Sequence, residues 1–379
     1  MIPPVSAVTY LDHHAATPLL PASRQAMAEA HSCAWANPSS VHAAGRASRA
    51  LLERARESIA RAIHAAPADL VLTGGGTEAC NLGVFGAAAG EAAGLVSTRI
   101  EHPAVTEAVV ALERQGWRAS WIETPRGAAP DLNAFERLLG PATRVAALQW
   151  VNHETGTLLP VSAYAERCRA LGVRVFVDAT QALGKVPVDV EALGADYVAF
   201  AAHKIGGPAG AGALWVRRGA PLASLALGGS QERGRRAGTP DTVAQVGFGA
   251  ACDALEQRVV DQTRIRGLRD RLEASLLELG ARRNADLGER VATVTNVWFP
   301  GLRSDVLVAA LDVEGVAASS GAACSSGKSE PSPVLLAMHS DDPDRAGSSI
   351  RFSFGLESSE TDVDFATAAI RRVLARQVR

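Results

Sequence analysis

The sequence predicts an α/β protein with a mainly parallel, helix-covered sheet in a large domain and a smaller α+β domain after it. Short apolar runs alternate with helical patterns through the first two thirds of the chain. Parallel strands need long crossover connections and are buried on both faces, so this alternation is typical of a helix-covered parallel sheet. After about Glu256 the pattern changes to a long charged helix, a few strands and a closing helix, which indicates a second, α+β unit.

Short apolar runs predict the strands of the large domain, at residues 70–72, 95–98, 144–148, 173–177, 197–200 and 213–216. Helical patterns separate several of these runs, at residues 104–115, 132–139 and 161–171, and a further helix begins at Thr77. In the second unit we predict helices at 261–279, at 304–311 and from about 360, and strands at 291–298 and 349–354. The chain then divides into an N-terminal segment that packs with the small domain, the large domain and the small domain, at residues 1–15, 16–256 and 257–379.

The composition excludes several classes of protein. Hydrophobic residues make up 47% and charged residues 21% of the 379 residues, as in ordinary globular proteins. The net charge of −2 gives no indication of a nucleic-acid groove or a membrane-binding surface, so we expect neither partner. No apolar run is long enough to span a bilayer, and the first residues lack the basic start and apolar stretch of a signal peptide. We therefore expect a cytoplasmic protein.

Five cysteines are spread widely along the chain, and none forms a CxxC pair. An odd number at this spacing argues against a disulfide framework and against a zinc site, so we predict no bound metal. We expect buried, inert thiols at Cys33, Cys80, Cys168 and Cys252. Cys324 differs, because it lies in a run of small residues at 319–327 that is too poor in large side chains to pack a core. Such a run predicts a mobile loop.

A glycine-rich turn at 74–76 lies between a predicted strand and a predicted helix. Backbone N–H groups at such a turn are unobstructed, and the helix N-terminus adds positive charge, so the turn could bind a phosphate group. A plain tight turn is the alternative. The segment matches neither the Walker A pattern nor GxGxxG, because both the Lys-Ser/Thr ending and the glycine spacing are absent.

Asp178 and Lys204 each follow an apolar strand, at the sheet edge where α/β proteins bind ligands. A carboxylate there could keep a pyridinium nitrogen protonated and make the ring withdraw electrons, although a helix cap or a metal ligand is also possible. A lysine at the end of a core strand could be a desolvated amine that forms an imine, or an ordinary solvated lysine. The order of glycine turn, aspartate and then lysine 26 residues later (204 − 178) favours an imine-forming lysine over an ordinary solvated one.

These features, taken with further motifs, resemble the pyridoxal-phosphate-dependent transferases of fold type I, in the class V aminotransferase superfamily. Within that superfamily the chain is most similar to cysteine desulfurases of the NifS/IscS type. The resemblance runs nearly end to end. Its motifs are YLDHHAATP (10–18), NPSSVHAAGR (37–46), TGGGTEACN (73–81), EHPAV (101–105), NHETG (152–156), VDATQALGKVPVD (177–189), HKIGGPAGAGAL (203–214), QERGRRAGT (231–239), SSGAACSSG (319–327), EPS (330–332) and SSIRFSFG (348–355).

The resemblance implies that residues 16–256 bind pyridoxal 5′-phosphate. Lys204 would hold the cofactor as a Schiff base, Asp178 would pair with the pyridine nitrogen and Gln181 would donate a hydrogen bond to the ring oxygen. His102 would stack on the ring and shuttle protons. The residues that would bind the phosphate group are Gly76, Thr77, His203 and, from the neighbouring subunit of a homodimer, Thr239.

The substrate implied by the resemblance is L-cysteine, with Asn37 and Arg351 on its carboxylate. Arginine suits this role because its planar fork binds a carboxylate through two hydrogen bonds, although Arg351 could instead be a surface or core-paired arginine. Three positions depart from the family pattern. His153 replaces an Asn that contacts the ring oxygen, Ala201 replaces a residue with a hydroxyl or thiol group near the phosphate, and Ala79 replaces a common Ser.

Cys324 lies in the motif that the family uses to remove sulfur. Its thiolate would take sulfur from L-cysteine, release L-alanine and hold a persulfide for a sulfur-acceptor or iron–sulfur scaffold protein. During that transfer Cys324 could contact an iron–sulfur cluster. The sulfur would serve iron–sulfur cluster or thio-cofactor assembly. The alternatives are a selenocysteine lyase or aminotransferase of the same superfamily, or a non-catalytic scaffold that has kept the fold.

Overall fold

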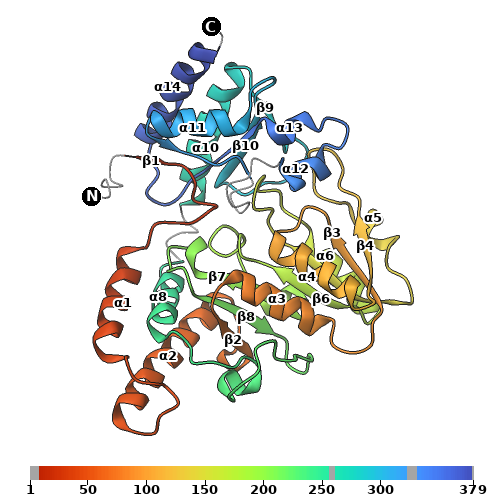
Figure 1. The fold of residues 1–379 in the computed structure, drawn as a ribbon, viewed down its shortest axis with the longest axis vertical. Helices are drawn as coiled ribbons and strands as arrows, with labels where there is room; N and C mark the ends of the chain where they lie inside the picture. The colour runs from red at the N-terminus through yellow and green to blue at the C-terminus, as the bar shows by residue number, and fades with distance from the viewer. Residues whose placement is uncertain (1–7, 256–260, 322–330, 378–379) are drawn as a thin grey trace.

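The computed structural model describes residues 8–255, 261–321 and 331–377. Its largest element is a seven-stranded sheet with strand order β2-β8-β7-β6-β5-β3-β4 (Figure 1). All neighbours from β7 to β4 pair in parallel, and β8 runs antiparallel to both β7 and β2. The prediction of a mainly parallel sheet is therefore confirmed. The strands are β2 (Leu70–Thr73), β3 (Gly94–Thr98), β4 (Arg118–Ile122), β5 (Thr143–Gln149), β6 (Arg174–Asp178), β7 (Tyr197–Ala201) and β8 (Gly212–Val216).

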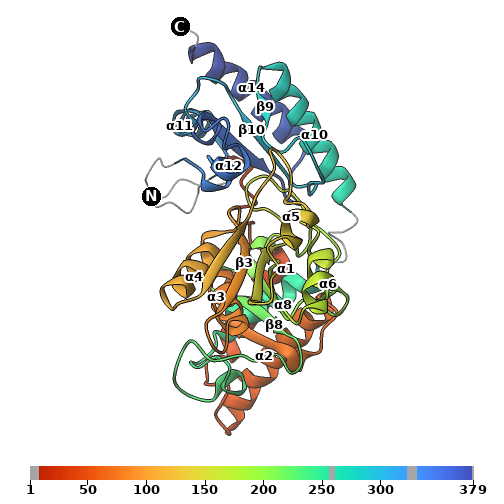
Figure 2. The same ribbon diagram turned by 90° about the vertical axis from the view of Figure 1, so that its right-hand side faces the viewer.

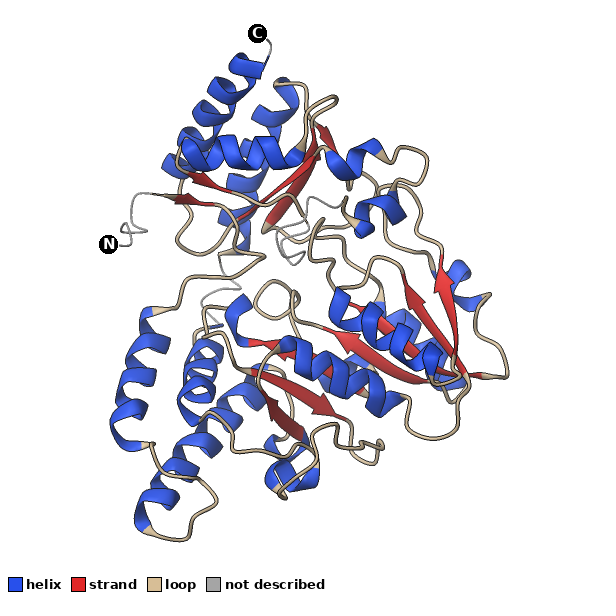
Figure 3. Cartoon of the chain, viewed as in Figure 1, coloured by secondary structure: helices blue, strands red, loops and turns tan. Residues whose placement is uncertain are grey.

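Helices cover both faces of this sheet, and the alternation of side chains along each strand explains why (Figure 3). In β6, for example, Val175 and Val177 belong to one hydrophobic core and Phe176 belongs to the other. Successive residues of a strand point to opposite faces, so a strand that is apolar throughout needs cover on both sides. One face packs on α3 (Gly76–Ala87) and α4 (Pro103–Arg114), and the other packs on α2 (Ala43–Ala62), α6 (Val161–Ala170) and α8 (Thr242–Asp253).

A smaller α+β region lies beside the sheet and contains the C-terminal third of the chain (Figure 2). Its central strand β10 pairs antiparallel with β12 and β9, and the helices α10, α11 and α14 share one hydrophobic core with that sheet. Strand β1 pairs in parallel with β11, which brings Leu11 into the same core. The ranges are β1 (Thr9–Tyr10), β9 (Arg282–Arg283), β10 (Val294–Trp298), β11 (Val316–Ala317), β12 (Ser349–Ser353), α10 (Gln262–Glu278), α11 (Ser304–Val313) and α14 (Glu360–Gln377).

The remaining helices connect these parts: α1 (Pro21–Cys33), α5 (Leu132–Glu136), α7 (Val190–Leu193), α12 (Pro333–Met338) and α13 (Asp344–Gly347). Two predicted ranges were too long. The helix expected over 132–139 ends at Glu136, and the strand expected over 291–298 begins at Val294. Val291 is apolar because it is buried beside the large sheet, where its N–H donates to the Gly156 carbonyl, and not because it belongs to a strand. No helix in the described ranges is both long and apolar enough to cross a membrane.

The topology places several chain turns at one edge of the seven-stranded sheet. Strands β2, β6 and β7 all point the same way, because β8 runs antiparallel to both β2 and β7. The glycine turn after β2, Asp178 at the end of β6 and Lys204 just after β7 therefore meet at the carboxyl edge. The domain boundaries proposed from the sequence stay a prediction.

Candidate active site

A cavity of about 560 Å³ lies at this carboxyl edge, between the large sheet and β12. Its volume is in the range of small-molecule binding sites. Most of the residues predicted to bind cofactor or substrate line it: Gly76, Thr77, His102, His153, Asp178, Gln181, His203, Lys204 and Arg351. Asn37 and Thr239 do not line it and are exposed in the single chain. Cys324 lies outside the described residues, although Gly321 and Pro331 on either side of its segment line the cavity.

The amine of Lys204 lies against the chain segment that follows β1. Its Nζ donates to the carbonyl of His14 at 2.7 Å and to the carbonyl of Ala15 at 2.9 Å. Thr17 fixes the same two segments together, because its hydroxyl donates to the His203 carbonyl and accepts from the Gly206 N–H. Two backbone carbonyl groups therefore hold the amine at the cavity.

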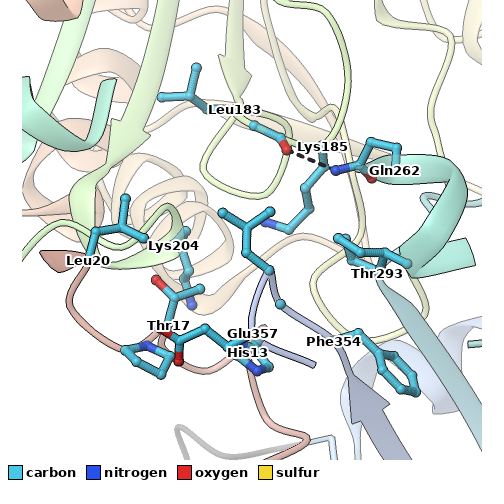
Figure 4. Close-up of a pocket in the computed structure, with 15 residues that line it drawn as sticks. His13, Thr17, Leu20, Leu183, Lys185, Lys204, Gln262, Thr293, Phe354 and Glu357 are labelled. Atoms are coloured by element: carbon cyan, nitrogen blue, oxygen red, sulfur yellow. Dashed lines mark hydrogen bonds between the residues drawn. The ribbon is translucent and has the colours of Figure 1, made fainter. Parts of the chain in front are cut away.

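Lys204 also borders a second, smaller cavity of about 40 Å³ (Figure 4). Gln262 at the start of α10 lies at its wall and donates from Nε2 to the Gly184 carbonyl at 3.2 Å. Lys185 lines this cavity but not the larger one, and its Nζ donates to Gln181 Oε1 at 2.9 Å. The two lysines thus lie close to the same site, but only Lys204 faces the large cavity.

Asp178 ends β6 and is 5% exposed. Its Oδ1 accepts from the Thr180 N–H at 2.9 Å, which fixes the carboxylate at the cavity. Gln181 is fixed at both ends of its amide, since Nε2 donates to the His14 carbonyl at 2.9 Å while Oε1 accepts from Lys185. A ring bound between Asp178 and Gln181 would find both side chains already oriented.

His102 caps α4, and its Nδ1 accepts from the Ala104 N–H at 3.0 Å. That hydrogen bond assigns the ring proton to Nε2. Burial lowers the pKa of His102, against the opposing effect of the Asp178 charge, so the ring is neutral near pH 7. His153 meets His102 edge to face with ring centroids 5.2 Å apart, and burial lowers the pKa of His153 well below its usual range. Two neutral imidazoles therefore form one side of the cavity.

The glycine turn has the geometry of an anion site. Gly75 has φ +149°, a conformation that residues with a Cβ rarely adopt, and it directly precedes α3. A Cβ at residue 76 would lie 3.0 Å from Ala201 Cβ and 3.1 Å from Thr180 Cγ2, so only glycine fits easily there. Burial and the nearby Lys204 lower the pKa of His203 to about 4. A phosphate group at this turn would meet a helix N-terminus and a neutral histidine that can donate a hydrogen bond.

Arg351 reaches the cavity from β12 and is 2% exposed. Its Nη2 donates to Asp12 Oδ1 at 2.8 Å, and its Nη1 donates to the His153 carbonyl at 3.0 Å. Its Nε is buried and has no hydrogen-bond partner. The arginine is thus paired inside the protein, as the alternative interpretation expected, yet it also lines the cavity and keeps one unpaired donor. Buried N–H groups are rarely left unpaired, so a bound carboxylate would complete its bonding.

Sequence reasoning missed four further titratable residues that line the cavity, namely His14, Cys80, Glu101 and Glu154. Cys80 is buried, as expected, and burial together with the Asp178 charge raises the pKa of its thiol well above its usual range. Burial also raises the pKa of Glu101 to about 8, although Thr98 donates to it at 2.6 Å. Only the position of Glu101 next to His102 could have indicated its place at the site.

The expected burial of the other thiols is correct for Cys168 and Cys252 and wrong for Cys33. Cys33 is the last residue of α1 and is exposed, with its thiol donating to the Glu29 carbonyl at 3.3 Å. An amphipathic helix has a solvent face, and position along the chain alone did not show which face Cys33 would occupy.

Comparison with known proteins identifies the family. The model of the class-V aminotransferase family matches residues 9–365. The chain belongs to the class-V aminotransferases. A cysteine desulfurase of Gluconacetobacter diazotrophicus is 37% identical over 375 residues, which cover 97% of this chain and 93% of that protein. An IscS-like cysteine desulfurase of Mycobacterium tuberculosis is 38% identical over 388 residues, 98% of each chain.

The solved structures agree with this family assignment. A NifS-like protein superposes with a TM-score of 0.90 at 29% identity, and the match covers 97% of this chain and all of that one. An SspA in complex with cysteine superposes with a TM-score of 0.77 at 27% identity, covering 91% of this chain and 98% of that one. The predicted fold and the predicted similarity to cysteine desulfurases are both confirmed.

The residues of this class-V aminotransferase fit pyridoxal phosphate, the cofactor that the family implies. The cavity is lined by an amine, a strand-end carboxylate and a glycine turn, which are the groups that would bind an aldehyde, a pyridine nitrogen and a phosphate. His153 Nδ1 and Glu101 Oε2 are buried there without a hydrogen-bond partner. Polar atoms left unpaired in a lined cavity are what a binding site for a polar molecule requires.

Proposed function

We propose that the protein is a pyridoxal-phosphate-dependent cysteine desulfurase, which converts L-cysteine into L-alanine and a persulfide on Cys324. The observation that supports this most is the meeting of Lys204, Asp178, the glycine turn and Arg351 at one cavity, in a chain with full-length similarity to cysteine desulfurases. None of these residues lies near the others in sequence. Their convergence therefore depends on the fold and not on one motif.

When bound, pyridoxal phosphate supplies an electron sink for the negative charge that develops at the α-carbon of the substrate. Lys204 would attach the cofactor and, once substrate has replaced it, accept the α-proton at Nζ. Asp178 would hold the proton of the ring nitrogen. Gln181 and His153 would contact the ring oxygen, and Gly76, Thr77 and His203 would bind the phosphate.

His102 would stack on the ring and move protons through Nε2, because its Nδ1 is already used at the start of α4. Arg351 would bind the substrate carboxylate with its unused donor. The role of Asn37 rests on its motif alone, since its Oδ1 accepts from the Ser39 N–H at 2.8 Å and the residue is exposed. Thr239 is also exposed, as it would be if it reached the phosphate site of a neighbouring subunit in a homodimer.

Cys324 would perform the step that defines the reaction. Its thiolate attacks the substrate Sγ and forms a sulfur–sulfur bond, while the Cβ–Sγ bond breaks and its electron pair goes to Cβ. A proton then reaches Cβ, and alanine leaves. The persulfide would pass its outer sulfur to an acceptor protein in iron–sulfur cluster or thio-cofactor assembly, in the cytoplasm. The small domain would carry Cys324. The segment 1–15 would pack with the small domain, and the parallel pairing of β1 with β11 supports this.

Product analysis tests this function against the other members of the superfamily. Purified enzyme supplied with L-cysteine and a reductant should give alanine and sulfide in equal amounts and no keto acid. Keto acid formation in place of alanine would indicate an aminotransferase, and activity with selenocysteine alone would indicate a selenocysteine lyase. A protein that binds no cofactor and forms neither product would be a scaffold.

A further inference from the structure

The glycine turn at 74–76 is fixed by a side chain that lies outside the large cavity. Glu78, in the first turn of α3, accepts from the Gly74 N–H through Oε2 at 2.7 Å. A carboxylate that reaches back from the start of a helix to a preceding N–H group stabilises the helix N-terminus. Gly76 and Thr77 line the large cavity, whereas Glu78 borders a different cavity of about 270 Å³. Glu78 therefore holds the turn without lining the large cavity.

Arg236 pairs with both oxygens of the Glu78 carboxylate. Its Nε donates to Oε1 at 2.7 Å and its Nη2 donates to Oε2 at 3.1 Å. The side chains of Arg236 and Glu78 are 19% and 35% exposed, so water screens the pair only in part. Burial acts to raise the pKa of Glu78, but the hydrogen bonds from Arg236 and from the Gly74 N–H outweigh it and hold this pKa below its usual value. The carboxylate is therefore ionised near pH 7, and Arg236 balances its charge.

The segment that contains Arg236 is joined to β2, the strand that leads into the glycine turn. Glu232 accepts from the Leu72 N–H at 2.9 Å, and Arg235 donates from Nη2 to the Leu70 carbonyl at 2.6 Å. Both contacts are with the backbone of β2, so the same strand positions the turn and the arginine that supports it. The geometry of the Glu78–Arg236 pair thus depends on the edge of the large sheet.

A carboxylate in this turn needs an explanation, because the turn is the proposed binding site of a phosphate group. Two negative charges at one partly buried turn repel each other more strongly than they would in water. An acidic residue in the first turn of a helix also interacts favourably with the helix dipole, and this alone would account for Glu78. It would not account for the two hydrogen bonds from Arg236, which balance that charge beside the turn. The pair leaves Glu78 as a hydrogen-bond acceptor for the turn and removes its net charge.

We propose that Glu78 and Arg236 are positioning residues for the phosphate site. Glu78 fixes the shape of the turn, and Arg236 neutralises Glu78 so that the turn can accept a doubly charged group. Neither side chain lines the large cavity, so neither would touch the phosphate. The inference rests on the proposed function, since it requires that the protein binds pyridoxal phosphate. It concerns the phosphate group alone and makes no demand on the ring or on Lys204.

The test compares pyridoxal phosphate with pyridoxal, which has the same ring and aldehyde but no phosphate group. The full-length protein is freed of cofactor with hydroxylamine, and the binding of each ligand is followed by absorbance. Arg236→Met leaves the Glu78 carboxylate without its balancing charge. We expect it to weaken the binding of pyridoxal phosphate by about tenfold or more, because like charges repel, and to leave the binding of pyridoxal unchanged.

A second substitution should reverse this loss. Glu78→Gln, added to Arg236→Met, removes the repelling charge, and its amide oxygen can still accept from the Gly74 N–H. We expect the double variant to regain most of the affinity for pyridoxal phosphate, whereas a purely structural ion pair would show no recovery. Glu78→Ala added to Arg236→Met also removes the charge but leaves no acceptor for that N–H, so it should regain less than Glu78→Gln does.

Arg217→Met is the matched control. Arg217 pairs with Asp196, and Asp196 accepts from the Val175 N–H at 2.8 Å, so the same combination of arginine, carboxylate and backbone N–H occurs there. That pair lies at the amino ends of β6 and β7, opposite the edge with the glycine turn, and its loss should not change the binding of either ligand. If Arg236→Met does not fold, Arg236→Lys compared with Arg217→Lys decides the question, because lysine keeps the charge but loses the planar fork. Arg236→Lys should then weaken the binding of pyridoxal phosphate several-fold and leave that of pyridoxal unchanged.

Thr239 offers a different route to the same loss, because it follows Arg236 closely and would bind the phosphate of a neighbouring subunit. Arg236→Met should therefore weaken the binding of pyridoxal phosphate by the same factor in wild type and in Thr239→Ala, since independent contributions add. The proposal would be overturned by a loss that disappears in Thr239→Ala, an equal loss for pyridoxal, a similar loss in Arg217→Met, or no recovery with Glu78→Gln. A wild-type protein that binds no pyridoxal phosphate would instead contradict the proposed function.

Discussion

Two parts of the protein form walls of the cavity, the seven-stranded sheet and the C-terminal region. These two walls are held in place by different kinds of contact. The sheet wall presents Asp178, Lys204 and the glycine turn, each within a few residues of a strand end. The other wall presents Arg351 and Glu154, which hydrogen bonds between distant segments hold in place. In the proposed function, cofactor chemistry would lie at the sheet edge, and substrate chemistry would lie at the wall that long-range contacts hold in place.

The first prediction challenges the sheet wall and has the largest expected effect. Lys204→Ala removes the amine that we propose attaches the cofactor and takes the α-proton, so we expect activity to fall about a thousandfold or more. Borohydride treatment of the wild type should attach the cofactor irreversibly to Lys204. Lys185→Ala serves as the matched control, because Lys185 borders only the smaller cavity, and it should still attach cofactor at Lys204. A label on any other lysine would refute the assignment.

The second prediction concerns the opposite wall. Arg351→Lys keeps the charge but loses the planar fork that reaches Asp12, the His153 carbonyl and the cavity together. We expect KM for L-cysteine to rise about tenfold to a hundredfold, since a hydrogen bond to a charged group contributes about 1.5–3 kcal/mol. Steady-state kinetics measure this effect. Arg345→Lys is the control, because Arg345 is equally buried and pairs with Asp342 outside the cavity; a similar rise in KM there would remove the argument.

The third prediction uses the buried carboxyl group of Glu101 and has the smallest effect. Its pKa is raised from 4.5 to about 8, so between these values the folded state holds a proton that the unfolded state has lost. The contribution of Glu101 to stability therefore falls as pH rises through this window, by at most about 1.4 kcal/mol per pH unit. Glu101→Gln cannot ionise and should lose that dependence. Urea unfolding of the wild type and of Glu101→Gln at pH 5, 6.5 and 8 measures this difference. If the free energies of unfolding of the two proteins change with pH in parallel, the prediction is contradicted.

The sheet wall could be predicted from sequence because its signals are local. A buried strand such as β6 is apolar throughout, and the functional residue follows directly, as Asp178 does. The exceptions lie at the margin of the sheet: β4 was missed because it is an edge strand, and its residues are mostly only half-buried. The helices α1 and α8 were also missed, because small residues make up much of their buried faces and give a weak periodic signal. Helix α2 was missed although its apolar residues recur at helical spacing.

The other wall could be predicted only through family motifs. His14 enters the cavity from near the N-terminus and is fixed by Ser353, which lies 339 residues away in the chain. Glu154 likewise acquires its surroundings from Ser332 and Asn296, which come from other parts of the chain. No local pattern encodes such contacts, because they depend on how the two regions pack together.

One measurement tests the central claim most directly: mass-spectrometric mapping of sulfur on the protein after a single turnover with L-cysteine, in wild type and in Cys324→Ser. We expect a persulfide on Cys324 in the wild type. The variant should bind cofactor and change its spectrum with L-cysteine but form almost no alanine and no persulfide. A persulfide on Cys33, Cys80, Cys168 or Cys252, or full turnover by Cys324→Ser, would contradict the proposed mechanism.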